Sequence, residues 1–328
     1  MGEAVGLSEA SVISRLARYQ SLGLVSRIGV VFKPHSIGMS TLAAMAVPDQ
    51  ELEEVAALVN GYSAVNHNYE REHRYNLWFV AAGEDSNAVE GVLADIESRT
   101  RVPVLRLPLV RDFHIDLGFS LAPASSACEI RRRAQPLERD TKHTLSEEER
   151  QLVSALDPGL PLVSRPFREI ALRAGTREVA VIRRLEHWLL LGVIRRVGIV
   201  VRHRELGYRA NGMVVWDLHD STVAEAGRQL ATFPWVTLCY QRPRQRPSWP
   251  YNLFTMVHGK DRAAVLGQVE RMASEAGVAN IPRETLFSVR RFKQTGARYG
   301  APVVRAMDSS PKNRGHCEIP APSPTVPS

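Results

Sequence analysis

Two segments of the chain carry a tyrosine and an arginine separated by one residue, and a basic loop follows each pair. The first pair is Tyr69 and Arg71, and the second is Tyr240 and Arg242. A guanidinium group binds a carboxylate through two parallel hydrogen bonds, so these arginines suit an anionic ligand that has carboxylate arms. A basic loop is usually just solvated, however, and both tyrosines can equally be core residues. The spacing alone therefore leaves a binding role and a structural role open.

Three histidines in the first half of the chain are candidates for proton transfer. His67 shares a strand face with the first tyrosine, His73 lies in the loop that follows, and His114 lies further on. Histidine is the side chain whose charge changes near neutral pH without a perturbed pKa. When the two repeats are aligned, Leu238 corresponds to His67 and Lys293 corresponds to His114. His114 and Lys293 can therefore each supply a cation to the site. The halves therefore form similar cradles with unequal chemistry.

Both segments belong to an internal repeat that covers most of the chain. VISRLARYQSLGLVSRIGVVF begins at Val12 and matches VIRRLEHWLLLGVIRRVGIVV, which begins 169 residues later at Val181. YNLW at Tyr75 matches YNLF at Tyr251, and the additional residues fall in the loop 243–250. A match of this length, with small changes of offset in loops, indicates a duplication.

Each repeat contains the same order of predicted elements. The second repeat begins with three helices and a hairpin, a winged helix-turn-helix, expected over 145–156, 166–174, 177–191, 193–197 and 199–202. The βαββαβ order of a ferredoxin-like domain follows. It recurs in the first repeat, where the last strand is expected over 104–116.

These elements predict an α+β fold, a tandem repeat of a winged helix-turn-helix plus a ferredoxin-like domain. The first helix-turn-helix lacks about two helices, because Gly6 aligns with Gly175. Either the fold has lost them or the true start lies upstream. The expected boundaries are a truncated winged helix-turn-helix over 1–38, a ferredoxin-like domain over 39–121, a linker over 122–144, a winged helix-turn-helix over 145–206, a ferredoxin-like domain over 207–300 and a disordered tail over 301–328.

The composition favours an anionic partner. The formal net charge is +7 and the pI is about 9.6, which suits nucleic acid and a carboxylate-rich tetrapyrrole equally well. No apolar run is long enough to span a bilayer, and the first residues do not resemble a signal peptide. The three cysteines lie far apart and form no CxxC pair, which argues against a cysteine zinc site. We expect a cytoplasmic protein.

The order of domains resembles the Lrp/AsnC plan. Regulators of that family usually carry a Gly-x-x-Asp turn entering the third strand, near the effector. The corresponding segments here are HNYEREHRYNLW over 67–78 and CYQRPRQRPSWPYNLF over 239–254, without that glycine and aspartate. With RDFHIDLGF over 111–119 and RRFKQTGARY over 290–299, they resemble the two halves of the siroheme decarboxylases of this superfamily. The resemblance covers about residues 4–300.

The resemblance implies a carboxy-lyase. Siroheme decarboxylases remove CO2 from two acetate arms of siroheme and make 12,18-didecarboxysiroheme on the way to heme d1 or heme. It implies no organic cofactor and no metal site of the protein's own, because the substrate carries the iron. The implied substrate-binding residues are Tyr69, Arg71, His73, Tyr240, Arg242, Arg244, Arg246 and Lys293, of which His73 can alternatively ligate iron. For this reaction we expect His67 and His114 to deliver protons, because histidine changes its charge near neutral pH.

Two other functions stay open on the sequence alone. Arg177, Arg183 and Arg184 on the third helix can contact DNA phosphates, as in an Lrp/AsnC-type transcriptional regulator. The apolar end of that helix and the incomplete first unit favour packing modules instead, so nucleic acid is not the expected partner. A heme-binding chaperone without chemistry is the third possibility. The expected partners are siroheme and homologous subunits or a second copy, with no membrane.

Two ferredoxin-like sheets in one chain can pair as the separate subunits of Lrp-like dimers do. We therefore expect a pseudo-dimer in which the two β-sheets pack face to face. The loops after Arg71 and Arg242 are expected to wall the site.

Overall fold

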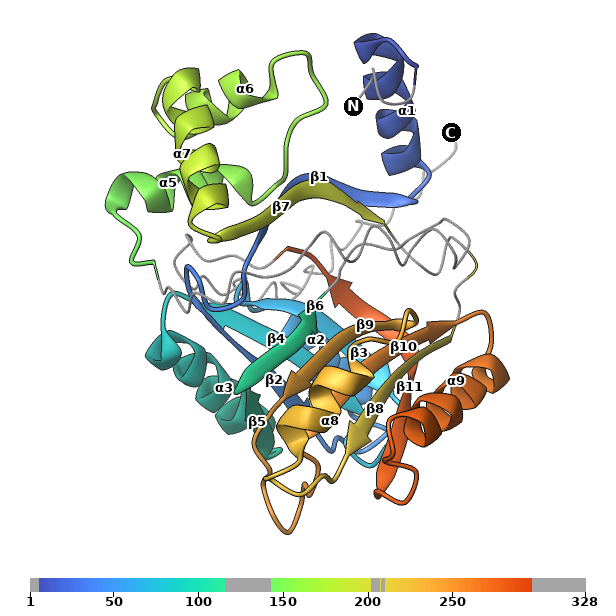
Figure 1. The fold of residues 1–328 in the computed structure, drawn as a ribbon. Helices are drawn as coiled ribbons and strands as arrows, with labels where there is room; N and C mark the ends of the chain where they lie inside the picture. The colour runs from blue at the N-terminus through green and yellow to red at the C-terminus, as the bar shows by residue number, and fades with distance from the viewer. Residues whose placement is uncertain (1–5, 116–142, 202–206, 208–209, 297–328) are drawn as a thin grey trace, which may run out of the picture.

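The computed structural model describes residues 6–115, 143–201, 207 and 210–296. In Figure 1 the helix-turn-helix elements and a small two-stranded sheet lie on one side, and a nine-stranded sheet with its helices lies on the other. The linker predicted over 122–144, apart from its last two residues, and the tail predicted over 301–328 lie outside the described residues. None of the helices that the structure describes is long and apolar enough to cross a membrane.

Both repeats contain the predicted βαββαβ order. The first repeat forms α1 (Glu9–Ser21), β1 (Val25–Phe32), β2 (Met39–Met45), α2 (Leu52–Asn60), β3 (Val65–Arg71), β4 (Leu77–Gly83), α3 (Ser86–Thr100), β5 (Val104–Pro108) and β6 (Arg111–Ile115). The second repeat forms α5 (Glu147–Leu156), α6 (Pro166–Arg173), α7 (Glu178–Leu190), β7 (Ile194–Val201), β8 (Ala210–Trp216), α8 (Val223–Leu230), β9 (Val236–Gln241), β10 (Leu253–Gly259), α9 (Arg262–Glu275) and β11 (Arg283–Gln294).

The N-terminal caps of equivalent helices are the same in the two repeats. Asp85 begins α3 and Asp261 begins α9, and each carboxylate accepts a hydrogen bond of 2.8 Å from the backbone N–H three residues later. This contact satisfies one of the donors that the first turn of a helix leaves unpaired. The equivalent helices therefore begin at equivalent residues in the two repeats.

The final strand of each repeat links the two halves. β11 pairs with β8 through Arg283–Phe287 and then with β3 of the other half through Ser288–Gln294. In the first repeat the single strand predicted over 104–116 is wrong, because the chain divides it into β5, which pairs with β2, and β6, which pairs with β9. The strand order is β5-β2-β4-β3-β11-β8-β10-β9-β6, so hydrogen bonds join both halves into one sheet.

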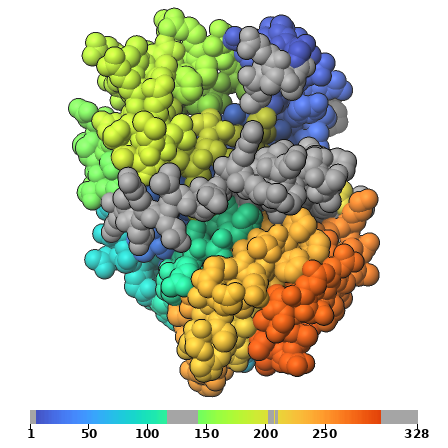
Figure 2. Space-filling view, viewed as in Figure 1, coloured from blue at the N-terminus to red at the C-terminus, as the bar shows by residue number. Residues whose placement is uncertain are grey.

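The two halves of this sheet also pack face to face, as predicted. A shared cluster, called the inner layer here, contains side chains from both repeats. Its buried members are Ala44, Trp78, Leu105, Leu107, Met213, Val215, Trp249, Tyr251, Phe254, Met256 and Leu286. In Figure 2 the teal surface of the first repeat lies directly beside the yellow and orange surface of the second.

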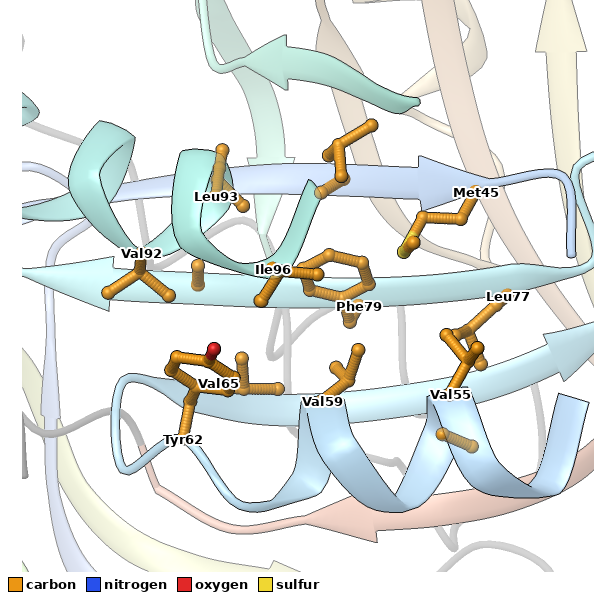
Figure 3. Packing of buried hydrophobic residues seen from close by; sticks show 14 of the residues in the cluster. Met45, Val55, Val59, Tyr62, Val65, Leu77, Phe79, Val92, Leu93 and Ile96 are labelled. Atoms are coloured by element: carbon orange, nitrogen blue, oxygen red, sulfur yellow. The ribbon is translucent and has the colours of Figure 1, made fainter. Parts of the chain in front are cut away.

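Helices cover the outer face of each half. α2 and α3 cover the first half, where Val59 and Ile96 meet Phe79 of β4 (Figure 3). α8 and α9 cover the second half in the equivalent way. The helix-covered face of the sheet is therefore largely apolar, and the opposite face meets the inner layer.

The hairpin predicted for the wing is also wrong. Residues 194–201 form one strand, β7, which pairs antiparallel with β1 of the first repeat. Gly198 is absent from the positive-φ residues of the described chain, so it does not reverse the strand. It lies opposite Gly29, its equivalent in the repeat, and the approximate twofold axis between the repeats passes through this pair.

The second helix-turn-helix has a core of its own, and the first has none. Val181, Leu185 and Trp188 of α7 are buried beneath α5 and α6. The equivalent helix α1 has no fully buried residue, and nothing described before it corresponds to α5 and α6. The strand β1 instead packs on the second unit, where Phe32 meets Trp188 edge to face at 5.9 Å.

Candidate active site

Strand β3 directs its candidate residues towards the inner layer. The Asn68 amide donates to the Ala56 carbonyl of α2 at 3.3 Å, so Asn68 faces the helices and its neighbours face the other way. The rings of His67 and Tyr69 lie 6.2 Å apart, and the Arg71 guanidinium lies 5.9 Å from the centre of the Tyr69 ring. Strand alternation therefore groups these three side chains as predicted.

Strand β9 carries the equivalent group. Leu238 and Tyr240 pack against the inner layer, whereas Cys239 between them belongs to the helix-covered core. The Arg242 guanidinium lies 4.9 Å from the centre of the Tyr240 ring, in a cation–π contact. Burial raises the pKa of Tyr240 to about 12, so its hydroxyl keeps its proton at neutral pH.

The two arginines make equivalent contacts across the pseudo-dimer. Arg71 donates through Nη1 to the Leu286 carbonyl of the second repeat at 2.9 Å. Arg242 donates through Nη1 to the Leu107 carbonyl of the first repeat. Leu107 and Leu286 are themselves equivalent residues, 179 positions apart. Each arginine therefore extends from its own half into the other.

Arg242 is a buried cation without a counter-ion among the described residues. Only 9 % of it is exposed, and its Nε has no hydrogen-bond partner in the described part of the chain. Burial lowers the pKa of its guanidinium to about 10. Burying a charge is costly unless an opposite charge is supplied. A bound carboxylate would supply that charge and a partner for Nε.

The loops after the two arginines contact each other, and their role as walls of the site stays a prediction. Arg74 donates through Nη2 to the Ser248 carbonyl in the longer loop. Trp249 of that loop is fully buried, and its ring lies 5.3 Å from Trp78 and 5.9 Å from Tyr75. The additional residues of the second repeat thus supply an aromatic group that fills one end of the inner layer.

Two of the predicted carboxylate-binding arginines already contact carboxylates. Arg244 pairs with Asp220 and, at 3.0 Å, with Asp217. Arg246 lies 3.5 Å from the same Asp217 oxygen, and its side chain is 66 % exposed. A substrate carboxylate would have to compete with these aspartates, so a binding role for either arginine stays a prediction.

His73 has both ring nitrogens engaged. Its Nδ1 accepts from the Tyr75 backbone N–H at 3.0 Å, and its Nε2 lies 3.3 Å from a Glu284 oxygen. Partial burial lowers its pKa, and Glu284 opposes that shift. Ligation of iron or binding of a carboxylate would require one of these contacts to break.

His67 is neutral at neutral pH in the ligand-free chain. Its Nδ1 lies 2.5 Å from Asn66 Oδ1. Burial, with a smaller contribution from the nearby Arg27 cation, lowers its pKa to about 4. The sequence argument assumed an unperturbed histidine, and that premise is wrong for His67. Its role in proton transfer stays a prediction that requires an anion nearby.

His114 and Lys293 occupy equivalent strands, but the structure does not place Lys293 at the inner layer. Lys293 donates through Nζ to the Asn60 carbonyl at 2.8 Å and to the Tyr62 carbonyl at 2.9 Å, at the end of α2. A cation in this place satisfies carbonyls that the helix leaves unpaired. His114 on β6 lies opposite Cys239 in the sheet. Substrate contact by either residue stays a prediction.

Comparisons with known proteins agree with this architecture. The model of the AsnC-like ligand binding domain matches residues 36–114 and 205–293. The siroheme decarboxylase NirDL-like HTH domain matches residues 149–195. The chain is 43% identical over 292 residues to the siroheme decarboxylase NirDL subunit of Paracoccus pantotrophus, a match that covers 88% of this chain and 87% of that protein. The chain belongs to the siroheme decarboxylase family.

A solved siroheme decarboxylase is similar to this structure over most of the chain. The crystal structure of siroheme decarboxylase NirDL in co-complex with an iron-uroporphyrin III analogue has a TM-score of 0.67 and 31% sequence identity, covering 92% of this chain and 87% of that one. Family members also occur as shorter subunits. The siroheme decarboxylase NirL subunit of Stutzerimonas stutzeri is 46% identical over 153 residues, which is 47% of this chain and 90% of that protein. A repeat of the present chain is thus similar in size to a separate subunit.

One group of polar residues in this chain was missed by sequence reasoning. Thr237 and His258 are buried and Asn211 is half-buried, on the same side of β8, β9 and β10 as Arg71. The available signal was a histidine inside a largely apolar run, because His258 is the penultimate residue of β10, a strand whose residues are all buried. Comparison of the two repeats did not reveal His258, because the equivalent residue in the first half is Ala82.

Proposed function

We propose that this chain removes CO2 from two acetate arms of siroheme and forms 12,18-didecarboxysiroheme. The observation that carries the proposal is the buried Arg242 cation, which has no carboxylate partner among the described residues. A site that accepts several carboxylates is the arrangement in which such a cation gains its missing partner. The solved relative that binds an iron-uroporphyrin analogue supports a ligand of this class.

The two Tyr-x-Arg groups would bind substrate. Each guanidinium can hold a carboxylate that does not react, while Tyr69 and Tyr240 offer aromatic faces to the macrocycle. These contacts exist before the reaction as well as in the transition state, so they set affinity more than rate. Decarboxylation itself needs a different group.

Each decarboxylation consumes one proton. The carbon–carbon bond to the carboxylate breaks, CO2 leaves, and the electron pair left on the methylene carbon takes a proton to form a methyl group. We assign proton delivery to His67 and His114. A bound carboxylate close to His67 would raise its pKa from about 4 towards neutrality and allow it to carry that proton. The macrocycle can delocalise the electron pair, so the proposal includes no organic cofactor.

The proposal places this carboxy-lyase in the cytoplasm, with siroheme as substrate and with homologous subunits as partners. Shorter relatives named as NirD, NirL and NirH subunits show that the family divides its repeats among several chains. We infer that a further siroheme decarboxylase subunit, or a second copy of this chain, associates with the chain for full activity.

Anaerobic incubation of the purified chain with siroheme tests the activity. Mass spectrometry of the porphyrin should show the loss of two CO2 units, with a species that has lost one as the intermediate. Boiled protein and protein without siroheme serve as controls. An unchanged porphyrin mass, with homologous subunits also supplied, would contradict the proposal. Bound siroheme whose mass does not change would indicate a carrier instead.

A further inference from the structure

A chain of hydrogen bonds, buried at one end and partly buried at Asn211, ends at Arg71. Arg71 Nη1 lies 3.5 Å from Asn211 Oδ1. Asn211 Nδ2 lies 2.9 Å from His258 Nε2, and His258 Nδ1 lies 3.2 Å from Thr237 Oγ1. Thr237 Oγ1 also donates to the Met256 carbonyl at 3.3 Å. Arg71, Thr237 and His258 are each less than a tenth exposed.

The hydrogen bond from the Thr237 hydroxyl to the Met256 carbonyl fixes the direction of the other hydrogen bonds. The Thr237 hydroxyl has one hydrogen, which it donates to the Met256 carbonyl, so it accepts from His258 Nδ1–H. His258 Nε2 therefore accepts, and Asn211 must present its NH2 group to it. The Asn211 amide can then present only its oxygen to the Arg71 guanidinium, which is a pure donor. One orientation satisfies every atom in this chain of contacts.

We propose that His258, acting through Asn211, is a positioning residue that holds the Arg71 guanidinium in place for a substrate carboxylate. Asn211 alone could rotate its amide by half a turn and direct two donors at the guanidinium. His258 prevents this rotation because its Nε2 accepts only from the NH2 group. A fixed guanidinium loses less conformational entropy when a carboxylate binds. This role rests on the proposed function of the site.

The equivalent arginine, Arg242, does not have this device. The residues equivalent to Asn211 and His258 are Ser40 and Ala82, which cannot form the same contacts. Arg242 contacts the Leu107 carbonyl and two aromatic rings, and its Nε has no partner among the described residues. The two arginines are therefore inequivalent: Arg71 is positioned before the ligand arrives, and Arg242 gains hydrogen bonds from it. A substrate carboxylate bound by Arg71 therefore meets a different environment from one bound by Arg242.

Three variants test the network with iron uroporphyrin and siroheme as the probes. His258→Leu removes both ring nitrogens, and His258→Gln keeps an acceptor for Asn211. Thr255→Val is the matched control, because Thr255 is equally buried on the same strand but faces the helices, where it accepts from Trp216 Nε1 at 3.1 Å. Affinity is measured by titration of the porphyrin absorbance, kcat and KM by product formation, and folding by thermal unfolding.

His258→Leu should weaken probe binding roughly tenfold, with KM rising more than kcat falls, since one hydrogen bond to a charged group is disturbed. His258→Gln should restore most of the affinity. Thr255→Val should lower thermal stability and leave affinity unchanged. If His258→Leu binds the probe like the wild type, or if His258→Gln is as weak as His258→Leu, the positioning role is overturned.

A double-mutant cycle separates positioning from general destabilisation. In an Arg71→Ala background His258→Leu should cause no further loss of affinity, whereas in an Arg242→Ala background the full loss should remain. Equal losses in both backgrounds would overturn the proposal and leave the proposed function intact. A wild-type chain that binds neither probe would overturn both, and the wild-type titration reveals that case by itself.

Discussion

At the scale of single residues, the unusual feature is a charge that is buried in each half of a duplicated cradle. A buried ion usually contributes to stability only when its partner is present. Arg242 has aromatic rings and one carbonyl around it but no carboxylate among the described residues. The buried Arg242 charge destabilises the free protein, and a carboxylate of the bound substrate would offset that cost.

Replacing Arg242 with Met should therefore separate stability from binding. The apolar side chain removes an uncompensated charge at similar length, so the free energy of unfolding should stay equal or rise by about 1 kcal/mol. Porphyrin affinity should fall at least roughly tenfold, because a charge-assisted hydrogen bond is lost. Urea unfolding and absorbance titration measure the two effects. A variant that is clearly less stable, yet binds as tightly as the wild type, would show that the cation is structural.

The two proposed acids predict a loss of rate rather than of affinity. His67→Ala and His114→Ala should depress kcat strongly while siroheme still binds, because proton transfer occurs only after binding. Single-turnover decarboxylation with a saturating amount of protein measures this directly. A protein that lacks both imidazoles and turns over like the wild type would refute the assignment. Arginine, or water held by Tyr69 or Tyr240, would then be the proton source.

The low pKa of His67 predicts how stability depends on pH. The folded pKa of about 4 lies below the ordinary value of 6.5, so the folded chain favours the neutral ring. This contribution is fully present above about pH 6.5 and is lost as the pH falls towards 4, where the unfolded state binds the proton first. His67→Gln should reduce the decline in unfolding free energy between pH 7 and pH 5. An unchanged decline would indicate that other groups cause it.

At the scale of elements, strand alternation was enough to predict which side chains share a face, but not which strands pair. The alternation of Tyr69 and Arg71 is local, and the structure confirms it. β11 is one continuous strand over 283–294, although its first part pairs within its repeat and its second part pairs with β3. Nothing in the sequence of this strand distinguishes a partner in the same repeat from one more than two hundred residues away. The same ambiguity explains the wing, where a hairpin and a pairing with β1 suit the same residues equally well.

The contact between β1 and the second helix-turn-helix depends on a glycine. Gly159 has a φ of +93°, and a Cβ added there would lie 2.6 Å from the Ile28 carbonyl oxygen. Gly159→Ala should therefore lower the free energy of unfolding by roughly 1–3 kcal/mol. Gly198→Ala is the matched control, since its nearest contact would be an arginine side chain at 3.7 Å. Equal effects of the two substitutions would show that the close contact between Gly159 and the Ile28 carbonyl does not limit stability.

The exposed arginines of α7 allow a direct comparison with a regulator. Arg184 is already paired with Glu149 at 2.7 Å, and the first repeat has no matching helix-turn-helix core. We therefore expect only weak binding to DNA, indifferent to sequence and steeply reduced by salt. Footprinting and a salt titration measure this. A specific footprint at nanomolar protein and physiological salt would favour regulation.

At the scale of the whole molecule, the exchange of terminal strands makes the halves interdependent. β6 completes the sheet of the second repeat, β11 extends that of the first, and the inner layer contains side chains from both. Cutting the chain at a protease site inserted in the predicted linker should therefore leave the two fragments associated. Size-exclusion chromatography in the absence of denaturant should show them eluting together. Fragments that separate and remain folded would contradict this interdependence.

The glycine pair at the approximate twofold axis, Gly29 and Gly198, marks where two copies of one ancestral surface meet within a single polypeptide. In an assembly of identical subunits, one mutation alters a position on both sides of such an axis. Here one mutation alters one side only. A histidine could therefore arise beside one arginine while alanine remained beside the other. Gene fusion thus allows natural selection to adjust the two ends of the cradle independently, each in a single mutational step.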